Sequence, residues 1–314
     1  MTLRRMMGSL SLCHGFARGW AVWLVVAPLL VPAAVPADAR GDDGGIPGVT
    51  VSADVVYGHK DGMALTYDVF RPDGRVGSQP GPALLLMVSG GWVSTWLPPA
   101  AMLPFMKPML DRGYTVITVR HGSSPRYVIP EIVNDVREAL AHVTAHAAEY
   151  GIDPQRLGVF GYSAGGHLSL MLGTTTNAAD ADRSNGEPRP HVAAVAAVLP
   201  PSELAPEREP AGPFLEQFPA LKFPRDQTDA YSPLRHVTPD DAPTLLVHGD
   251  KDELVPLFHS ERIRDAFETA AVDTSLVVIE GAAHGFDAEG NRRMFEAMLD
   301  WFDRHLADRE KSHP

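Results

Sequence analysis

Short apolar runs alternate with longer amphipathic stretches along the chain after residue 48. Residues 83–89 read Ala-Leu-Leu-Leu-Met-Val-Ser, which is the continuously apolar pattern of a strand covered on both faces. Short, β-branched apolar runs predict strands at residues 49–57, 64–70, 83–89, 114–119, 157–162, 192–199, 244–248 and 275–279. Helices are predicted at residues 99–112, 129–150, 164–173, 258–270 and 292–306.

This alternation predicts an α/β fold with a mostly parallel central sheet and helices on both of its faces. Because no internal repeat or interdomain linker interrupts the pattern, we expect a single domain over residues 49–308. Residues 202–243 differ from the rest, since they are proline-rich and only weakly periodic. We interpret them as an insertion at one edge of the domain that borders the functional site.

The N-terminus has the three-part layout of a secretory signal peptide over residues 1–39. Three arginines precede an apolar run at residues 20–35, and Ala37-Asp38-Ala39 supplies a cleavage site of small residues. The apolar run is short for a spanning helix and contains two prolines, so an uncleaved anchor is the less favoured alternative. We therefore expect a flexible lead at residues 40–48 and a secreted or periplasmic protein without stable membrane insertion.

Composition excludes several classes of function. The net charge of −12 argues against a nucleic-acid partner, because binding to phosphates requires a basic surface. The single cysteine, Cys13, excludes a disulfide framework and a thiolate metal cluster. His142 and His146 have a metal-ligand spacing on a predicted helix, but no third ligand is evident and we interpret them as a solvated helix face. Neither a metal nor an organic cofactor is expected.

A candidate nucleophile lies between a predicted strand and a predicted helix. Gly161-Tyr162-Ser163-Ala164-Gly165 fits the pattern Gly-x-Ser-x-Gly, in which a tight turn exposes the serine hydroxyl. Larger side chains at positions 161 and 165 would collide with the neighbouring strand and helix. The alternative interpretation is an ordinary turn with a helix-capping serine.

A serine nucleophile requires a base, and the base requires an acid that orients it. His284 stands in a loop of small residues directly after the last predicted strand. The stretch after the preceding strand offers Asp250, Asp252 and Glu253. We choose Asp252 as the acid, expect Asp250 to cap the turn through local backbone hydrogen bonds, and expect Glu253 to face water. The order serine, aspartate, histidine is the one that this kind of fold demands.

Acyl transfer also needs hydrogen-bond donors for an oxyanion. One donor is expected to be the backbone N–H of Ala164, the residue after the nucleophile. The second is expected from the loop Ser89-Gly90-Gly91-Trp92, through the N–H of Gly91 or of Trp92. Trp92 and Trp96 are equally compatible with the wall of an apolar pocket and with core packing.

A polar loop at residues 120–125 follows another predicted strand and contains Arg120. Two interpretations are open for it. The loop either rims the site or has a structural role, with Arg120 paired to a carboxylate such as Asp135.

Residues 50–306 resemble the α/β-hydrolase superfamily, specifically esterases similar to the hormone-sensitive-lipase and feruloyl/acetylxylan-esterase groups. The resemblance is carried by Ser-Gly-Gly-Trp at 89–92, His-Ala-Ala-Glu-Tyr-Gly-Ile-Asp-Pro at 146–154, Gly-Tyr-Ser-Ala-Gly-Gly-His-Leu at 161–168, Tyr-Ser-Pro at 231–233, His-Gly-Asp-Lys-Asp at 248–252 and His-Gly-Phe at 284–286. It implies an α/β-hydrolase fold and places the acid at Asp252. Relatives usually have histidine where Ser89 stands, and that histidine braces the oxyanion loop, so the loop must be held differently here.

These observations together predict an exported serine hydrolase that cleaves carboxylic esters through an acyl-enzyme. The substrate is expected to be a small-molecule or glycan-borne ester. A peptidase of the prolyl-oligopeptidase type shares the triad order, but such enzymes usually carry a large propeller domain that no part of this sequence matches. A protein that has this fold but only binds a ligand is the second alternative.

Overall fold

The computed structural model describes residues 47–73, 79–177, 190–204 and 212–306. The predicted signal peptide at residues 1–39 lies outside the described residues, as do most of the predicted lead, residues 205–211 of the predicted insertion and residues 307–308 at the predicted end of the domain. Within the described ranges, no helix is both long and apolar enough to cross a membrane.

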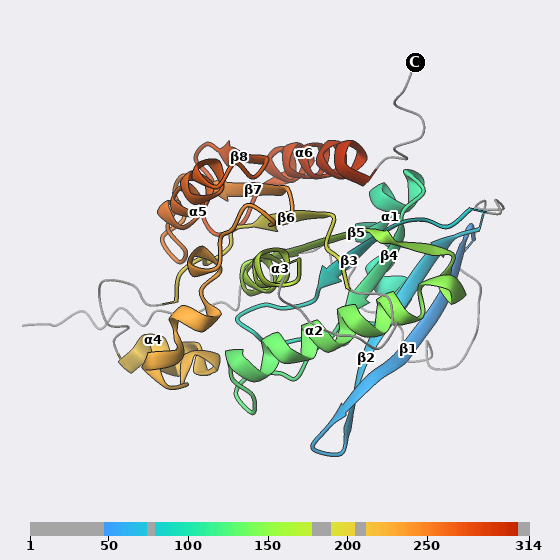
Figure 1. Cartoon of the computed structure of the whole chain (residues 1–314), viewed down its shortest axis with the longest axis horizontal. Helices are drawn as coiled ribbons and strands as arrows, with labels where there is room; N and C mark the ends of the chain where they lie inside the picture. Colours follow the sequence, from blue (N-terminus) through green and yellow to red (C-terminus); the bar gives the residue numbers. More distant parts are fainter. Residues whose placement is uncertain (1–46, 74–78, 178–189, 205–211, 307–314) are drawn as a thin grey trace, which may run out of the picture.

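Eight strands form one sheet (Figure 1). They are β1 (Val49–Lys60), β2 (Met63–Pro72), β3 (Gly81–Met87), β4 (Thr115–Val119), β5 (Ile152–Tyr162), β6 (Ala194–Val198), β7 (Thr244–Gly249) and β8 (Thr274–Ile279). Their order across the sheet is β1-β2-β4-β3-β5-β6-β7-β8. The pairs β1–β2 and β2–β4 are antiparallel, and every other neighbouring pair is parallel. The predicted mostly parallel sheet is therefore confirmed.

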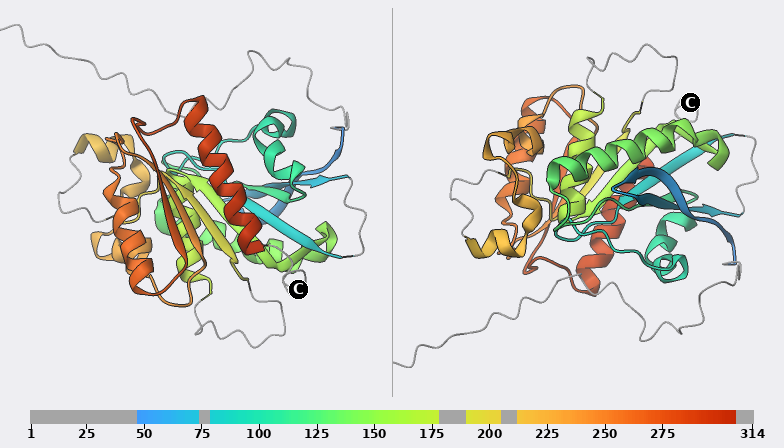
Figure 2. Two further views of the ribbon diagram at one scale, coloured as in Figure 1. Left: turned by 90° about the horizontal axis from the view of Figure 1, so that it is seen from above. Right: turned by 90° about the horizontal axis from the view of Figure 1, so that it is seen from below.

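Helices cover both faces of this sheet. Helices α1 (Pro99–Asp111) and α6 (Ala288–Leu306) pack with one set of strand side chains, and α2 (Ile129–Ala145), α3 (Ala164–Thr175) and α5 (Phe258–Thr269) pack with the other. Along β3, Leu84 and Leu86 belong to the first core and Leu85 and Met87 to the second, as the alternation of side chains in a strand requires. Figure 2 shows α6 in front of the sheet from one side and α2 in front of it from the opposite side.

Some predicted boundaries are wrong. The helix predicted at residues 129–150 ends at Ala145, and a separate 3-10 turn, Ala147–Tyr150, precedes the left-handed residue Gly151. Strand β5 begins at Ile152 and not at residue 157, and α6 begins at Ala288 and not at residue 292. The early part of β5 is polar and its register with β3 is irregular, so it lacks the apolar pattern on which the prediction depended.

The segment between β6 and β7 contains the predicted insertion. Its described part folds into short helices with no strand: α4 (Gly212–Gln217) and the 3-10 turns η2 (Pro219–Leu221), η3 (Arg225–Gln227), η4 (Asp229–Tyr231) and η5 (Pro233–Arg235). Ser232 Oγ accepts a hydrogen bond from the Leu204 N–H at 2.8 Å, and the Leu234 N–H donates to Ser202 O at 3.0 Å. These bonds join the start of the segment to the region of η5.

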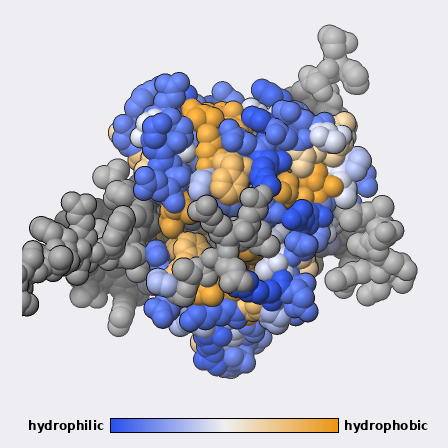
Figure 3. Space-filling view, turned by 90° about the vertical axis from the view of Figure 1, so that its left-hand side faces the viewer, coloured by the Kyte–Doolittle hydropathy of each residue, from blue (hydrophilic) through white to orange (hydrophobic). Residues whose placement is uncertain are grey.

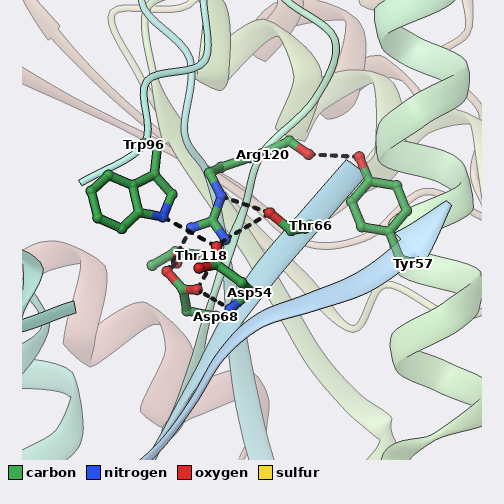
Figure 4. Close-up of polar contacts among 7 residues, drawn as sticks. All are labelled: Asp54, Tyr57, Thr66, Asp68, Trp96, Thr118 and Arg120. Carbon is green, nitrogen blue, oxygen red and sulfur yellow. Dashed lines mark hydrogen bonds and ion pairs between the residues drawn. The ribbon is translucent and has the colours of Figure 1, made fainter. Parts of the chain in front are cut away.

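Arg120 joins the three antiparallel strands (Figure 4). Among the described residues, its carboxylate partners do not include Asp135. Its guanidinium donates to both carboxylate oxygens of Asp68 on β2 and, at 2.8 Å, to Asp54 on β1. Asp135 instead accepts from Lys60 Nζ at 2.8 Å and from the Gly122 N–H at 2.9 Å. The structural interpretation of Arg120 is therefore supported, with a different partner from the one expected, because sequence alone does not show which strands become neighbours.

Candidate active site

The predicted site residues follow the carboxyl ends of neighbouring parallel strands. The loop with Gly91 and Trp92 follows β3, Ser163 follows β5, Asp252 follows β7 and His284 follows β8. Parallel strands end at one edge of a sheet, so segments far apart in the sequence meet there. The sheet order places β3 directly beside β5 and β7 directly beside β8.

Ser163 occupies a strained turn between β5 and α3. Its φ of 52° lies in the left-handed region, which costs a non-glycine residue of order 1–3 kcal/mol. The side chain makes no capping hydrogen bond to α3, contrary to the alternative interpretation as a capping serine. The steric role predicted for the flanking glycines is confirmed. A Cβ on Gly161 would lie 2.4 Å from the Gly165 carbonyl carbon, and one on Gly165 would lie 2.5 Å from Met87 O.

The structure brings Ser163, His284 and Asp252 into a hydrogen-bonded chain. His284 Nε2 is 2.8 Å from Ser163 Oγ, and His284 Nδ1 is 2.6 Å from Asp252 Oδ2. An ionised carboxylate only accepts hydrogen bonds, so the Nδ1 atom of a neutral His284 carries the proton. The lone pair of Nε2 is then directed at the serine hydroxyl, which is the arrangement of a general base beside a nucleophile.

The carboxyl group of Asp252 is fully buried and held by several donors. Burial alone would raise its pKa, but hydrogen bonds from His248, His284 and the Val255 N–H outweigh burial and hold the pKa well below its usual range. Oδ1 accepts from the backbone N–H groups of Leu254 and Val255 at 3.0 and 2.9 Å. Asp252 is therefore a fixed anion, as the orienting role requires.

The other two carboxylates near Asp252 have different positions. Glu253 is exposed, as expected. Asp250 departs from the prediction, because its carboxylate binds a backbone N–H outside its own turn as well as the adjacent Lys251 at 3.2 Å. Its Oδ1 accepts from the Gly281 N–H at 2.6 Å, so it joins the loop after β7 to the loop that carries His284. The Lys251 N–H adds a second link by donating to Ala282 O at 2.9 Å.

Gly249, the last residue of β7, lies against the backbone of the loop that carries His284. A Cβ at this position would lie 2.3 Å from Ala282 O and 2.7 Å from Ala283 O, and both are backbone atoms that cannot move without the loop. We expect Gly249→Ala to displace His284 and to lower kcat by about 10-fold or more, because small misplacements of catalytic groups are costly. The exposed Lys251→Ala is the control, and kcat should stay within about 3-fold of wild type. Wild-type kcat in Gly249→Ala would contradict this account of the loop.

The loop after β3 makes a tight turn. Gly90 and Val93 exchange two backbone hydrogen bonds of 3.0 Å, and the two residues between them, Gly91 and Trp92, have φ angles of 56° and 60°. Positive φ at both central residues is typical of two-residue hairpin turns. Among the described residues, neither the Gly91 N–H nor the Trp92 N–H donates a hydrogen bond, so both remain free to bind an anion.

Aromatic side chains from the insertion cover this turn. The Phe218 ring packs edge-on against Trp92 with centroids 6.4 Å apart, and it would contact a Cβ on Gly91 at 3.3 Å. One side chain of the insertion therefore lies beside Gly91 and Trp92. Trp92 is buried, whereas the Trp96 side chain is half-exposed and donates to Asp54 Oδ1, so Trp96 is not a core residue.

Apolar surface appears between hydrophilic residues on the side of the molecule that carries α4 and α5 (Figure 3). Phe214 on α4 and Phe258 at the start of α5 are among the exposed large apolar side chains.

Two buried histidines that the sequence patterns did not single out lie next to the predicted site residues. His248 Nε2 lies 3.3 Å from Asp252 Oδ2, and His167 contacts Trp92. Both belong to motifs that carried the resemblance, which is the only signal that could have identified them. In the part of the chain that the structure describes, no group of three or more His, Cys, Asp or Glu residues could hold a metal ion. His142 and His146 are partly exposed, and His142 bonds to Tyr67 Oη at 2.9 Å and stacks on His146.

Comparison with known proteins gives one family and several relatives. The family model described as BD-FAE matches residues 67–267. Esterase LipQ of Mycobacterium tuberculosis is 28% identical over 262 residues, which are 80% of this chain and 61% of that protein. The probable carboxylic ester hydrolase LipM of the same organism is 31% identical over 255 residues, which are 76% of this chain and 57% of that protein. The chain therefore spans about 60% of the length of these relatives.

Among solved structures, Thermogutta terrifontis esterase 2 phosphoramylated by tabun is similar in fold. Its TM-score is 0.67 at 25% sequence identity, and the match covers 84% of this chain and 97% of that one.

Proposed function

The chain belongs to the BD-FAE family and has an α/β-hydrolase fold, and from this premise we propose that it is a serine hydrolase that cleaves carboxylic esters through an acyl-enzyme. The observation that carries the proposal is the hydrogen-bonded chain from Ser163 through His284 to Asp252. The names of esterase LipQ and of the probable carboxylic ester hydrolase LipM support the same reaction class.

In the proposed mechanism, Ser163 Oγ attacks the carbonyl carbon of the ester while its proton passes to His284 Nε2. The tetrahedral intermediate collapses, the bond from the carbonyl carbon to the alcohol oxygen breaks, and His284 protonates the leaving alcohol. Water then attacks the acyl-enzyme with the same base, which releases the acid and restores Ser163. Asp252 holds the Nδ1 proton and stabilises the imidazolium that forms in each half-reaction.

The oxyanion of each tetrahedral intermediate would be held by backbone N–H groups. We assign one to Ala164, at the start of α3, where a helix N-terminus favours negative charge. The other is assigned to Gly91 or Trp92, whose N–H groups lack partners among the described residues.

We propose an uncharged ester, small or carried on a glycan, as the substrate. The net charge of −12 disfavours a polyanionic partner through long-range repulsion. The Gly-Gly-Trp turn and the Phe218 ring add an apolar boundary on the oxyanion side.

The test is a substrate panel applied to the wild-type protein. It contains 4-nitrophenyl esters of graded chain length, acetylated and feruloylated glycans, and prolyl amides. We expect turnover of esters and none of prolyl amides. Amide turnover that exceeds ester turnover would favour the peptidase alternative, and failure to cleave any member would favour a protein that only binds its ligand.

We also propose that the protein is exported and cleaved after Ala39. The support is the arrangement of charged, apolar and small residues over residues 1–39. N-terminal sequencing of the protein recovered from a bacterial host should begin at Arg40, outside the cytoplasm. A cell-associated protein that retains Met1 would contradict export with cleavage.

A further inference from the structure

His167 connects three parts of the proposed active site. It lies on α3, one turn after the nucleophile, and its backbone N–H donates to Ser163 O at 2.9 Å. Its imidazole is completely buried. Nδ1 lies 3.3 Å from Trp92 Nε1 on the turn after β3, and Nε2 lies 2.8 Å from Tyr231 O in the insertion. One side chain therefore contacts the turn and the insertion from the helix that begins at Ser163.

The conformation of the turn requires stabilising contacts. Trp92 has a positive φ, which is unfavourable for a large side chain, so surrounding contacts must hold it there. Ser89, at the base of the loop, has a buried hydroxyl with no hydrogen-bond partner among the described residues. The Trp92 backbone is held by the Ser124 N–H, which donates to Trp92 O at 3.0 Å, and the polar contact of its side chain is with His167.

The donors and acceptors around His167 define its tautomer. An indole N–H can only donate and a backbone carbonyl can only accept, so Nδ1 carries the lone pair and Nε2 carries the proton. Burial lowers the pKa of His167 to about 4, which keeps the ring neutral near pH 7. A protonated ring would place an Nδ1–H against the indole N–H and break this bond.

We propose that His167 is a positioning residue for the oxyanion turn, and that the bond from Trp92 Nε1 to His167 Nδ1 keeps the Gly91 and Trp92 N–H groups aligned with Ser163. This inference rests on the proposed function. The bond positions the turn but is not itself one of the proposed oxyanion donors. Its loss should therefore affect transition-state stabilisation more than substrate binding.

Two substitutions separate the two hydrogen bonds of His167. In His167→Asn, the amide oxygen can occupy the place of Nδ1 and accept from Trp92, while the bond to Tyr231 is lost. In His167→Gln, the amide nitrogen can occupy the place of Nε2 and donate to Tyr231, while the bond to Trp92 is lost. Both lose packing, so a merely structural role would lower kcat to a similar degree in both.

We expect His167→Gln to lower kcat for 4-nitrophenyl acetate by about 10- to 100-fold and to change KM by less than about 3-fold. Complete removal of one oxyanion donor lowers kcat by about 100- to 1,000-fold, and a misaligned turn should lose part of that effect. His167→Asn should keep kcat within about 3-fold of wild type. Trp92→Phe removes the same bond from the other side. The double variant Trp92→Phe with His167→Gln should therefore be no more than about 3-fold worse than the poorer single variant.

A direct readout of the bond does not depend on activity. The Trp92 indole N–H signal in a ¹H–¹⁵N spectrum, identified by its absence in Trp92→Phe, should lie downfield in wild type and His167→Asn and move toward the solvent-exposed position in His167→Gln. The proposal would be overturned if the indole signal moved in His167→Gln while kcat stayed at the wild-type value. Equal loss of kcat in His167→Gln and His167→Asn would also overturn it. An inactive wild type would instead overturn the proposed function, whatever the spectrum shows.

Discussion

Ser163→Ala is expected to lower kcat for 4-nitrophenyl acetate by at least about 10,000-fold, because the nucleophile of a triad cannot be replaced by its neighbours. The Ser163 side chain bonds to His284 and does not cap α3, so its loss should leave the fold intact. Circular dichroism and the melting temperature should therefore match those of wild type to within about 3 °C.

Ser169→Ala is the matched control for this substitution. Ser169 lies on the same helix, and its buried hydroxyl bonds to Gly165 O at 2.9 Å and to no group of the proposed triad. Its kcat should remain within about 3-fold of wild type. Substantial ester turnover in Ser163→Ala, measured on protein with an unchanged melting temperature, would exclude Ser163 as the nucleophile.

Asp252→Asn is expected to lower kcat by about 1,000- to 10,000-fold with little change in the fold. An asparagine side chain can donate its N–H₂ to His284 Nδ1, which would move the imidazole proton to Nε2 and remove the base that Ser163 needs. The substitution also removes the buried anion that stabilises the imidazolium. The effect should appear in kcat and kcat/KM alike.

Asp250→Asn provides the comparison within the same turn. Its remaining carbonyl oxygen can still accept from the Gly281 N–H, so the two loops should stay joined and kcat should fall by less than about 5-fold. If Asp250→Asn were the severe variant and Asp252→Asn the mild one, the acid would have been assigned wrongly.

The sheet and the order of the site residues could be predicted from the sequence because both depend on local patterns. Short apolar, β-branched runs indicated each strand. The glycines around Ser163 indicated a close approach between the turn and its neighbours, which the structure contains. The positions of Asp252 and His284 followed from the strands that precede them. The carboxyl ends of parallel strands lie along the same side of the sheet, so residues that directly follow neighbouring strands come close together.

What could not be predicted depends on contacts between distant segments. Arg120 pairs with Asp68 and Asp54 because β2 and β1 lie beside it in the sheet. The sequence around residue 120 does not show which strands these neighbours are. Asp250 bonds across 31 residues to the Gly281 N–H, in addition to its ion pair with the adjacent Lys251. The insertion folds into short turns that are held by tertiary hydrogen bonds. Because these turns lack a hydrophobic period, the sequence pattern could not predict them.

Covalent labelling tests the central claim most directly, because it asks whether Ser163 is the activated nucleophile. The wild-type protein would be incubated with a fluorophosphonate, digested, and mapped by mass spectrometry. We predict one adduct per chain on the peptide that contains Ser163, and none in Ser163→Ala or in protein unfolded beforehand. A folded wild-type protein that remains unlabelled, or an adduct on any other residue, would contradict the account.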